Sequence, residues 1–114
     1  MPNLYIIAGP NGAGKTTIAF TLLPETLSIK EFVNADEIAR GISPFNPESV
    51  AFQAGRVMLN RIDDLLLSGE SFSIETTLTT LSYLKTIERA KRAGYEVVLF
   101  YIWLKTPEIS IERE

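Results

Sequence analysis

The fold is decided by the stretch Gly9-Pro10-Asn11-Gly12-Ala13-Gly14-Lys15-Thr16. It matches G-x-x-x-x-G-K-[ST], the sequence pattern of the phosphate-binding P-loop. An apolar, β-favouring stretch precedes it at 4–8, and apolar residues at helical spacing follow it over 17–23. Because a strand before the loop and a helix after it are the context in which this pattern binds phosphate, the sequence predicts a nucleotide site here.

Each part of the loop has a chemical role. The glycines let the backbone curl so that successive N–H groups point inward and form an anion nest. The helix that begins near Gly14 adds its positive N-terminal end. Lys15 can reach the outer phosphates, and the Thr16 hydroxyl can bind Mg²⁺. We therefore predict that the nucleotide is bound by the residues from the first glycine to the second threonine, namely Gly9, Pro10, Asn11, Gly12, Ala13, Gly14, Lys15, Thr16 and Thr17.

The composition excludes several other kinds of chemistry. The 114 residues are enough for one domain with a core, and no apolar run approaches the ~20 residues of a membrane helix. The chain has no cysteine, which excludes disulfides and zinc–thiolate sites and is compatible with a cytoplasmic protein. It also has no histidine, so any proton acceptor must be Asp, Glu, Lys or Tyr.

The charge of the chain argues against a nucleic-acid partner. The net charge is −3 at neutral pH. Arg89, Lys91 and Arg92 stand in the last turns of a predicted helix, where positive charge suits the helix dipole. We interpret them as a solvated face, and we expect neither a nucleic acid nor a membrane among the partners.

Strands and helices alternate along the chain, which predicts a three-layer α/β fold with a parallel sheet. The predicted strands lie at 4–8, 31–34, 71–75 and 96–104, and the predicted helices at 14–23, 34–40, 47–67 and 81–93. Asn46 is the expected cap of the third helix, with Pro47 in its first position. We expect the Met and Phe side chains of that helix, Met58 and Phe52, to be core residues and not ligand contacts.

The end of the chain predicts an incomplete sheet. Thr106-Pro107-Glu108 has the pattern of another helix start, shortly before the sequence stops at Glu114. The run 97–104 is apolar on both faces, so it would become an exposed edge if the sheet ended there. We therefore expect residues 1–114 to be one kinase-like domain, incomplete at its C-terminus, or a chain that associates with itself through 97–104.

Polar residues follow three of the predicted strands at the edge where ligands of a parallel sheet bind. They are the P-loop, Asn34 with Asp36, and residues 75–77. Asp36 is either a general base or Mg²⁺ partner, or a helix-start acid that binds backbone donors. Glu75 has either a function, in binding a substrate hydroxyl or organising Mg²⁺, or none, as an exposed carboxylate at the end of a strand. Thr77 either donates to a substrate or caps the next helix.

Together, these segments resemble the zeta-toxin-like P-loop kinases. The resemblance rests on the P-loop, on Asn34-Ala35-Asp36-Glu37, on Ser73-Ile74-Glu75-Thr76-Thr77 and on 94–108, and it covers essentially the whole chain. It implies an ATP- and Mg²⁺-dependent kinase that phosphorylates a small-molecule acceptor. In members studied as toxins, the acceptor is a UDP-N-acetyl amino sugar. The resemblance also implies an antitoxin protein as a partner.

The resemblance assigns a role to individual residues. Lys15 and Thr16 take the phosphate and Mg²⁺ roles, Asp36 takes the acceptor's proton, and Glu75 and Thr77 bind the acceptor. The family also places basic residues in a lid after the fourth strand, where this sequence offers only Arg113. Because arginines that stabilise the transferring group contribute about 10³–10⁵ in rate, we expect a chain ending at Glu114 to transfer phosphoryl groups poorly.

Two other interpretations compete with a kinase. Residues 9–17 also resemble the loop of ABC-type ATPases, and Leu67-Ser68-Gly69-Glu70 is similar to their signature motif. However, that tetrapeptide precedes a predicted strand instead of opening a helix, so we interpret it as a helix stop. The other interpretation is a nucleotide-binding module without transfer activity, which the absence of lid arginines favours and the presence of Asp36 and Glu75 disfavours.

Overall fold

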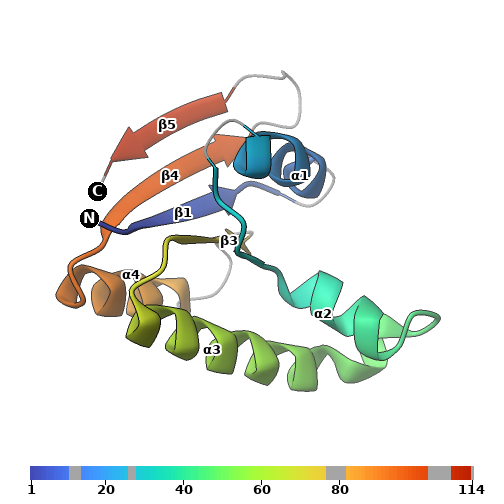
Figure 1. Ribbon diagram of the computed structural model, residues 1–114. Helices are drawn as coiled ribbons and strands as arrows, with labels where there is room; N and C mark the ends of the chain where they lie inside the picture. The colour runs from blue at the N-terminus through green and yellow to red at the C-terminus, as the bar shows by residue number, and fades with distance from the viewer. Residues whose placement is uncertain (11–13, 26–27, 77–81, 103–108, 114) are drawn as a thin grey trace.

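The computed structural model describes residues 1–10, 14–25, 28–76, 82–102 and 109–113. The strands and helices alternate as predicted (Figure 1). In chain order, the elements are β1 (Asn3–Ala8), α1 (Lys15–Glu25), β2 (Phe32–Val33), α2 (Ala35–Ile42), η1 (Pro47–Val50), α3 (Ala51–Ser68), β3 (Phe72–Thr76), α4 (Ser82–Arg92), β4 (Glu96–Ile102) and β5 (Ile109–Arg113).

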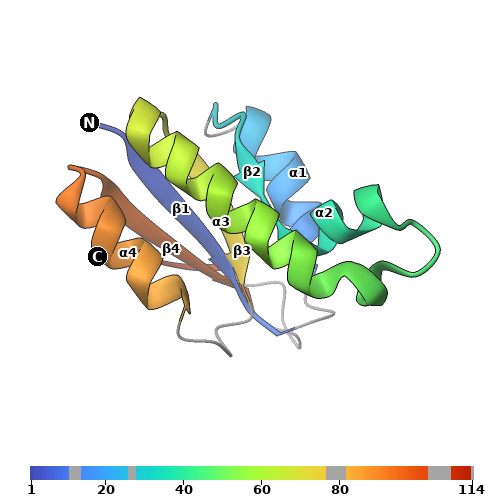
Figure 2. The same cartoon turned by 90° about the horizontal axis from the view of Figure 1, so that it is seen from below.

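The strands form one sheet in the order β2-β3-β1-β4-β5. The first four strands of that order are parallel, as predicted. Helix α1 covers one face of the sheet, and α3 and α4 lie over the other (Figures 1 and 2). None of the helices in the described part of the chain is long and apolar enough to cross a membrane.

Apolar side chains fill the space on both faces of the sheet. On the α1 face, Ala19 and Leu23 belong to one buried cluster with Ile7 and Phe100 of the strands. On the other face, a second cluster joins residues of α3, α4 and the strands, among them Ile62, Leu65, Ala90, Leu4, Ile6 and Phe72. Strand β1 is therefore buried on both sides, as its apolar sequence predicts. The three-layer α/β fold class is confirmed.

The predicted helix near the C-terminus is wrong, because residues 109–113 form strand β5. It pairs antiparallel with β4, from Ile102 opposite Ile109 to Val98 opposite Arg113. Ile109 and Ile111 alternate with polar residues, which is the period of a strand. The edge of β4 offers this segment a row of backbone hydrogen bonds, and these stabilise it more than the first turn of a short helix would. Because β4 pairs with β1 on one side and with β5 on the other, the expectation of an exposed edge is wrong for 97–102, and the described part of β4 has no free edge for self-association. Residues 103 and 104 lie outside the described part of the chain.

The start of α3 also differs from the prediction. The Asn46 side chain makes no capping hydrogen bond, because its backbone (φ −148°, ψ 63°) lies outside the geometry of a helix cap. A short 3₁₀ helix, η1, follows, and α3 begins only at Ala51. Met58 is half-buried beside the core, whereas Phe52 is exposed, so the expectation that Phe52 belongs to the core is wrong.

The end of α3 is confirmed as a helix stop. Gly69 adopts the left-handed conformation (φ 73°) that favours glycine, and its N–H donates to the Leu65 carbonyl at 3.0 Å. Strand β3 begins at Phe72, three residues later. Because no helix opens at Leu67-Ser68-Gly69-Glu70, this tetrapeptide lacks the context of an ABC signature.

Candidate functional site

The P-loop, Asn34 and Glu75 meet at one edge of the sheet. Ala8 ends β1 opposite Thr76 at the end of β3, and β2 ends at Val33, opposite Ile74. Because these strands are parallel, their carboxyl ends lie at the same edge. The structure thus brings together the three segments that the sequence predicts there.

Gly9 shapes the entry to the P-loop. Its N–H donates to the Thr76 carbonyl at 3.3 Å, and its φ of 149° is one that side chains rarely adopt. A Cβ atom at this position would lie 2.6 Å from the Ile102 carbonyl oxygen of β4. Only glycine therefore allows the chain to leave β1 between its two neighbouring strands.

Lys15 is buried and bound to the first residue of the P-loop. It is the first residue of α1 and only 5% exposed, and its Nζ donates to the Gly9 carbonyl at 2.6 Å. The ammonium group is thus fixed next to the positive N-terminal end of α1. Both charges face the region where a P-loop binds phosphate, which makes this end of the sheet a candidate anion site.

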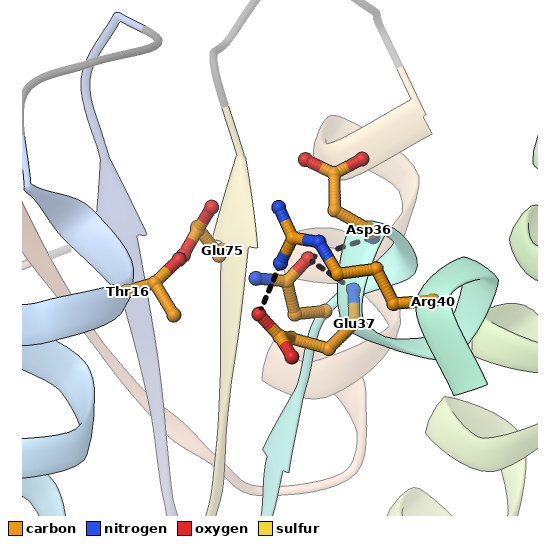
Figure 3. A network of polar contacts seen from close by, with 6 residues as sticks. Thr16, Asp36, Glu37, Arg40 and Glu75 are labelled. Atoms are coloured by element: carbon orange, nitrogen blue, oxygen red, sulfur yellow. Dashed lines mark hydrogen bonds and ion pairs between the residues drawn. The ribbon is translucent and has the colours of Figure 1, made fainter. Parts of the chain in front are cut away.

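Thr16 and Glu75 form the polar contact that joins α1 to β3 (Figure 3). The Thr16 hydroxyl donates to Oε1 of Glu75 at 2.9 Å. This bond uses the hydroxyl proton and leaves the lone pairs of Thr16 Oγ1 for a cation. Mg²⁺ takes oxygen ligands, and sites of this kind use one or two protein groups together with substrate phosphates. The pair therefore fits Mg²⁺, although the described residues contain no cluster of three or more metal-binding side chains.

Asn34 caps helix α2 and leaves Asp36 free. Its Oδ1 accepts hydrogen bonds from the backbone N–H groups of Asp36, at 2.8 Å, and Glu37, at 3.4 Å. The helix-capping role that the sequence left open for Asp36 thus belongs to Asn34. The Asp36 carboxylate is exposed and has no hydrogen-bond or ion-pair partner among the residues that the structure describes.

Two cavities adjoin at this edge of the sheet. The smaller, about 290 Å³, lies over the P-loop and is lined by Gly14, Lys15, Thr16, Thr17, Asp36, Arg40 and Glu75. The larger, about 590 Å³, lies between α2, α3, α4 and β3 and is lined by Asn34, Ala35, Asp36, Ala51, Phe52, Gly55, Arg56, Met58, Leu59, Ile62, Ile74, Glu75, Thr76, Tyr83 and Thr86. Asp36 and Glu75 line both cavities, so the two carboxylates stand where the cavities meet.

Most of the predicted site residues that the structure describes line these cavities. Gly9 and Pro10 line neither of them, and Asn11, Gly12, Ala13 and Thr77 lie outside the described residues. Arg113, the expected lid residue, stands opposite Val98 on β5, four residues back from the carboxyl end of β4. Its backbone is therefore away from the edge where the cavities lie, and the lid interpretation of Arg113 is wrong.

Sequence reasoning missed several residues of the site. Arg40 stands four residues after Asp36, one helical turn away, and this spacing is a signal that could have found it. Tyr83 and Thr86 of α4 offered no such signal, because only the packing of α4 beside α3 brings them to the larger cavity.

Comparisons with known proteins agree with this geometry. Residues 1–113 match the family model of the Zeta toxin. An uncharacterised protein of Haemophilus influenzae is 30% identical over 105 residues, which cover 92% of this chain and 73% of that protein.

Two solved structures share the fold. A candidate kinase from Chloroflexus aurantiacus superposes with a TM-score of 0.71 at 17% identity, over 89% of this chain and 58% of that one. A structure from the PezAT chromosomal toxin–antitoxin system of Streptococcus pneumoniae gives a TM-score of 0.70 at 25% identity, over 89% of this chain and 46% of that one. The chain thus spans about half the length of these two structures. With its P-loop, its three-layer fold and the family match along nearly its whole length, the chain belongs to the Zeta toxin family.

Proposed function

We propose that this chain binds ATP in the smaller cavity and an acceptor in the larger one, and transfers the γ-phosphoryl group to a hydroxyl of the acceptor. The observation that carries the proposal is that Asp36 and Glu75 line both cavities. A group that touches both sites can act on the phosphoryl group and on its acceptor at once. We further propose that the acceptor is a UDP-N-acetyl amino sugar, the class that the family resemblance implies.

The smaller cavity suits the phosphates of a nucleotide. Lys15 and the N-terminal end of α1 supply positive charge, and the backbone N–H groups of the first turn of α1 supply donors. Thr16, positioned by Glu75, would hold Mg²⁺. The ion, when bound, offsets charge on the phosphate oxygens, and the protein residues keep the nucleotide in place.

The larger cavity suits a small molecule with both polar and apolar parts. Its volume lies within the roughly 300–1,000 Å³ typical of small-molecule sites. Asn34, only 5% exposed, lines it, and its Nδ2 has no hydrogen-bond partner in the described part of the chain. Because a buried donor without an acceptor is costly, this amide favours a ligand that brings an oxygen atom to it.

We propose Asp36 as the general base. In the proposed step, the acceptor oxygen forms a bond to the γ-phosphorus while the bond between that phosphorus and the β,γ-bridging oxygen breaks. The proton of the acceptor hydroxyl passes to the Asp36 carboxylate, and ADP leaves with the bridging oxygen. An exposed carboxylate without a partner has both oxygens available for that proton.

The test is to incubate the chain with Mg²⁺, ATP and UDP-N-acetylglucosamine and to analyse the sugar nucleotide by mass spectrometry. We expect a product that carries one additional phosphoryl group and forms together with ADP, at the low rate that the sequence predicts. ADP formed without a phosphorylated sugar would point to hydrolysis or another acceptor and would contradict the proposed acceptor class. An unchanged mixture would contradict transfer itself.

We also propose an antitoxin protein as a partner of this chain. The toxin–antitoxin system to which the pneumococcal structure belongs supports this proposal.

A further inference from the structure

We propose that Arg40 is a phosphate-binding residue, whose guanidinium leaves Glu37 when ATP binds and contacts the γ-phosphoryl group. This inference rests on the proposed function, because it takes ATP as the ligand of the smaller cavity. It assigns to α2 a positive charge at the transferring group.

Arg40 shares a cavity with the P-loop residues. It lines the smaller cavity together with Gly14, Lys15 and Thr16. It also stands one turn after Asp36 on α2, so both side chains emerge from the same face of the helix. Figure 3 shows the Arg40 side chain reaching from α2 toward the side on which Thr16 and Glu75 lie.

The smaller cavity has a second cationic side chain besides Lys15. Of the described residues that line it, two are cationic, Lys15 and Arg40, and two are acidic, Asp36 and Glu75. The Lys15 side chain is buried, and its ammonium is already bound to the Gly9 carbonyl. An ATP molecule brings several negative charges beside the two carboxylates, and Arg40 is the cation that α2 contributes to this cavity.

The present partner of Arg40 holds it only weakly. Arg40 Nη1 lies 2.6 Å from Oε1 of Glu37, and the two side chains are 58% and 37% exposed. Exposed pairs of this kind contribute little net free energy, because water solvates both groups when they separate. A phosphate offers the guanidinium two oxygens at once, which is a stronger and more directional contact. Exchange of Glu37 for a phosphate is therefore favourable.

Arg40 should contact the γ-phosphate in particular. Backbone N–H groups of a P-loop surround the inner phosphates, and the γ-phosphate is the outermost. In the proposed mechanism it faces Asp36, and Arg40 stands one turn from Asp36. ADP lacks the group that Arg40 would bind, so the contact should distinguish ATP from ADP.

The experiment is calorimetric titration of the wild-type chain and of Arg40→Gln with Mg·ATP and with Mg·ADP. We expect Arg40→Gln to weaken ATP binding about tenfold or more and to change ADP binding by less than about twofold. Glu37→Gln, which frees the guanidinium, should strengthen ATP binding and leave ADP binding unchanged. The matched control is Arg61→Gln, because Arg61 forms a similar pair with Glu31 (2.6 Å, with 46% and 35% exposed side chains) and lines neither cavity.

The outcomes separate this inference from the proposed function. If the wild-type chain binds ATP and Arg40→Gln leaves the ratio of ATP to ADP affinity unchanged, Arg40 does not bind the γ-phosphate. Equal losses for both nucleotides would likewise overturn the inference, since they would indicate a general structural effect. If the folded wild-type chain binds neither nucleotide, the proposed function falls and this inference falls with it.

Discussion

Asp36→Asn is expected to lower the rate of phosphoryl transfer about 10²–10⁴-fold, the usual contribution of a general base, while Mg·ATP binding stays close to that of the wild type. Asparagine has the same shape but cannot accept the proton of the acceptor hydroxyl. The cap of α2 does not depend on this side chain, because Asn34 provides it. The rate is measured as phosphorylated UDP-N-acetylglucosamine formed per unit time, and ATP affinity by calorimetry on the same samples.

The control for Asp36→Asn is Asp64→Asn, the same substitution at an exposed carboxylate of α3 that lines neither cavity. Asp64→Asn should leave both quantities unchanged. A full transfer rate in Asp36→Asn would exclude Asp36 as the base. It would leave Glu75, the other carboxylate that lines both cavities, as the group to substitute next.

Lys15→Ala is expected to weaken ATP binding about a hundredfold, because it removes a charged donor from the phosphate site. The measurement is the melting temperature with and without Mg·ATP. At an ATP concentration of about 100 times its Kd, binding adds about 2.7 kcal/mol to the free energy of unfolding, which raises the melting temperature of a small domain by about 10 °C. In Lys15→Ala the same ATP concentration only equals the weakened Kd, so binding adds about 0.4 kcal/mol and the rise should fall to about 2 °C.

Lys30→Ala serves as the control, since Lys30 is exposed and lines neither cavity. It should show the same ATP-dependent rise as the wild type. Because Lys15 also donates to the Gly9 carbonyl, Lys15→Ala can lower the melting temperature without ligand. The comparison is therefore made between the rises and not between the absolute temperatures. An undiminished rise in Lys15→Ala would show that the nucleotide does not bind at the P-loop.

The sequence predicts those elements of the fold that depend on neighbouring residues in the chain. The apolar strand before the P-loop, the helix after it and the helix stop at Gly69 each depend on a few neighbouring residues. Strand β5 could not be predicted in this way, because its partner is the free edge of β4 and its preceding Thr106-Pro107-Glu108 has the local pattern of a helix start. Pairing between strands outweighed the local signal there.

Of the candidate site, only the residues at the carboxyl ends of the strands could be predicted from the sequence. Parallel strands bring their carboxyl ends together, so the P-loop, Asp36 and Glu75 could be expected to meet. The larger cavity depends on how α3 and α4 pack, and no local pattern in the sequence records that packing. Asn34 was expected at this edge. Only the structure shows that its Oδ1 caps α2 while its Nδ2 has no partner among the described residues.

The arrangement of two adjoining sites with Asp36 between them can be tested by NMR on ¹⁵N-labelled chain. Mg·ADP is added first, followed by UDP-N-acetylglucosamine, so that no transfer takes place. We expect ADP to shift the backbone amide signals of Lys15 and Thr16, and the sugar nucleotide then to shift the Asn34 side-chain amide and the backbone amides of Tyr83 and Thr86, with ADP still bound. Reversal of the ADP shifts by the sugar nucleotide would mean that both ligands compete for one site, and would contradict transfer between two neighbouring cavities.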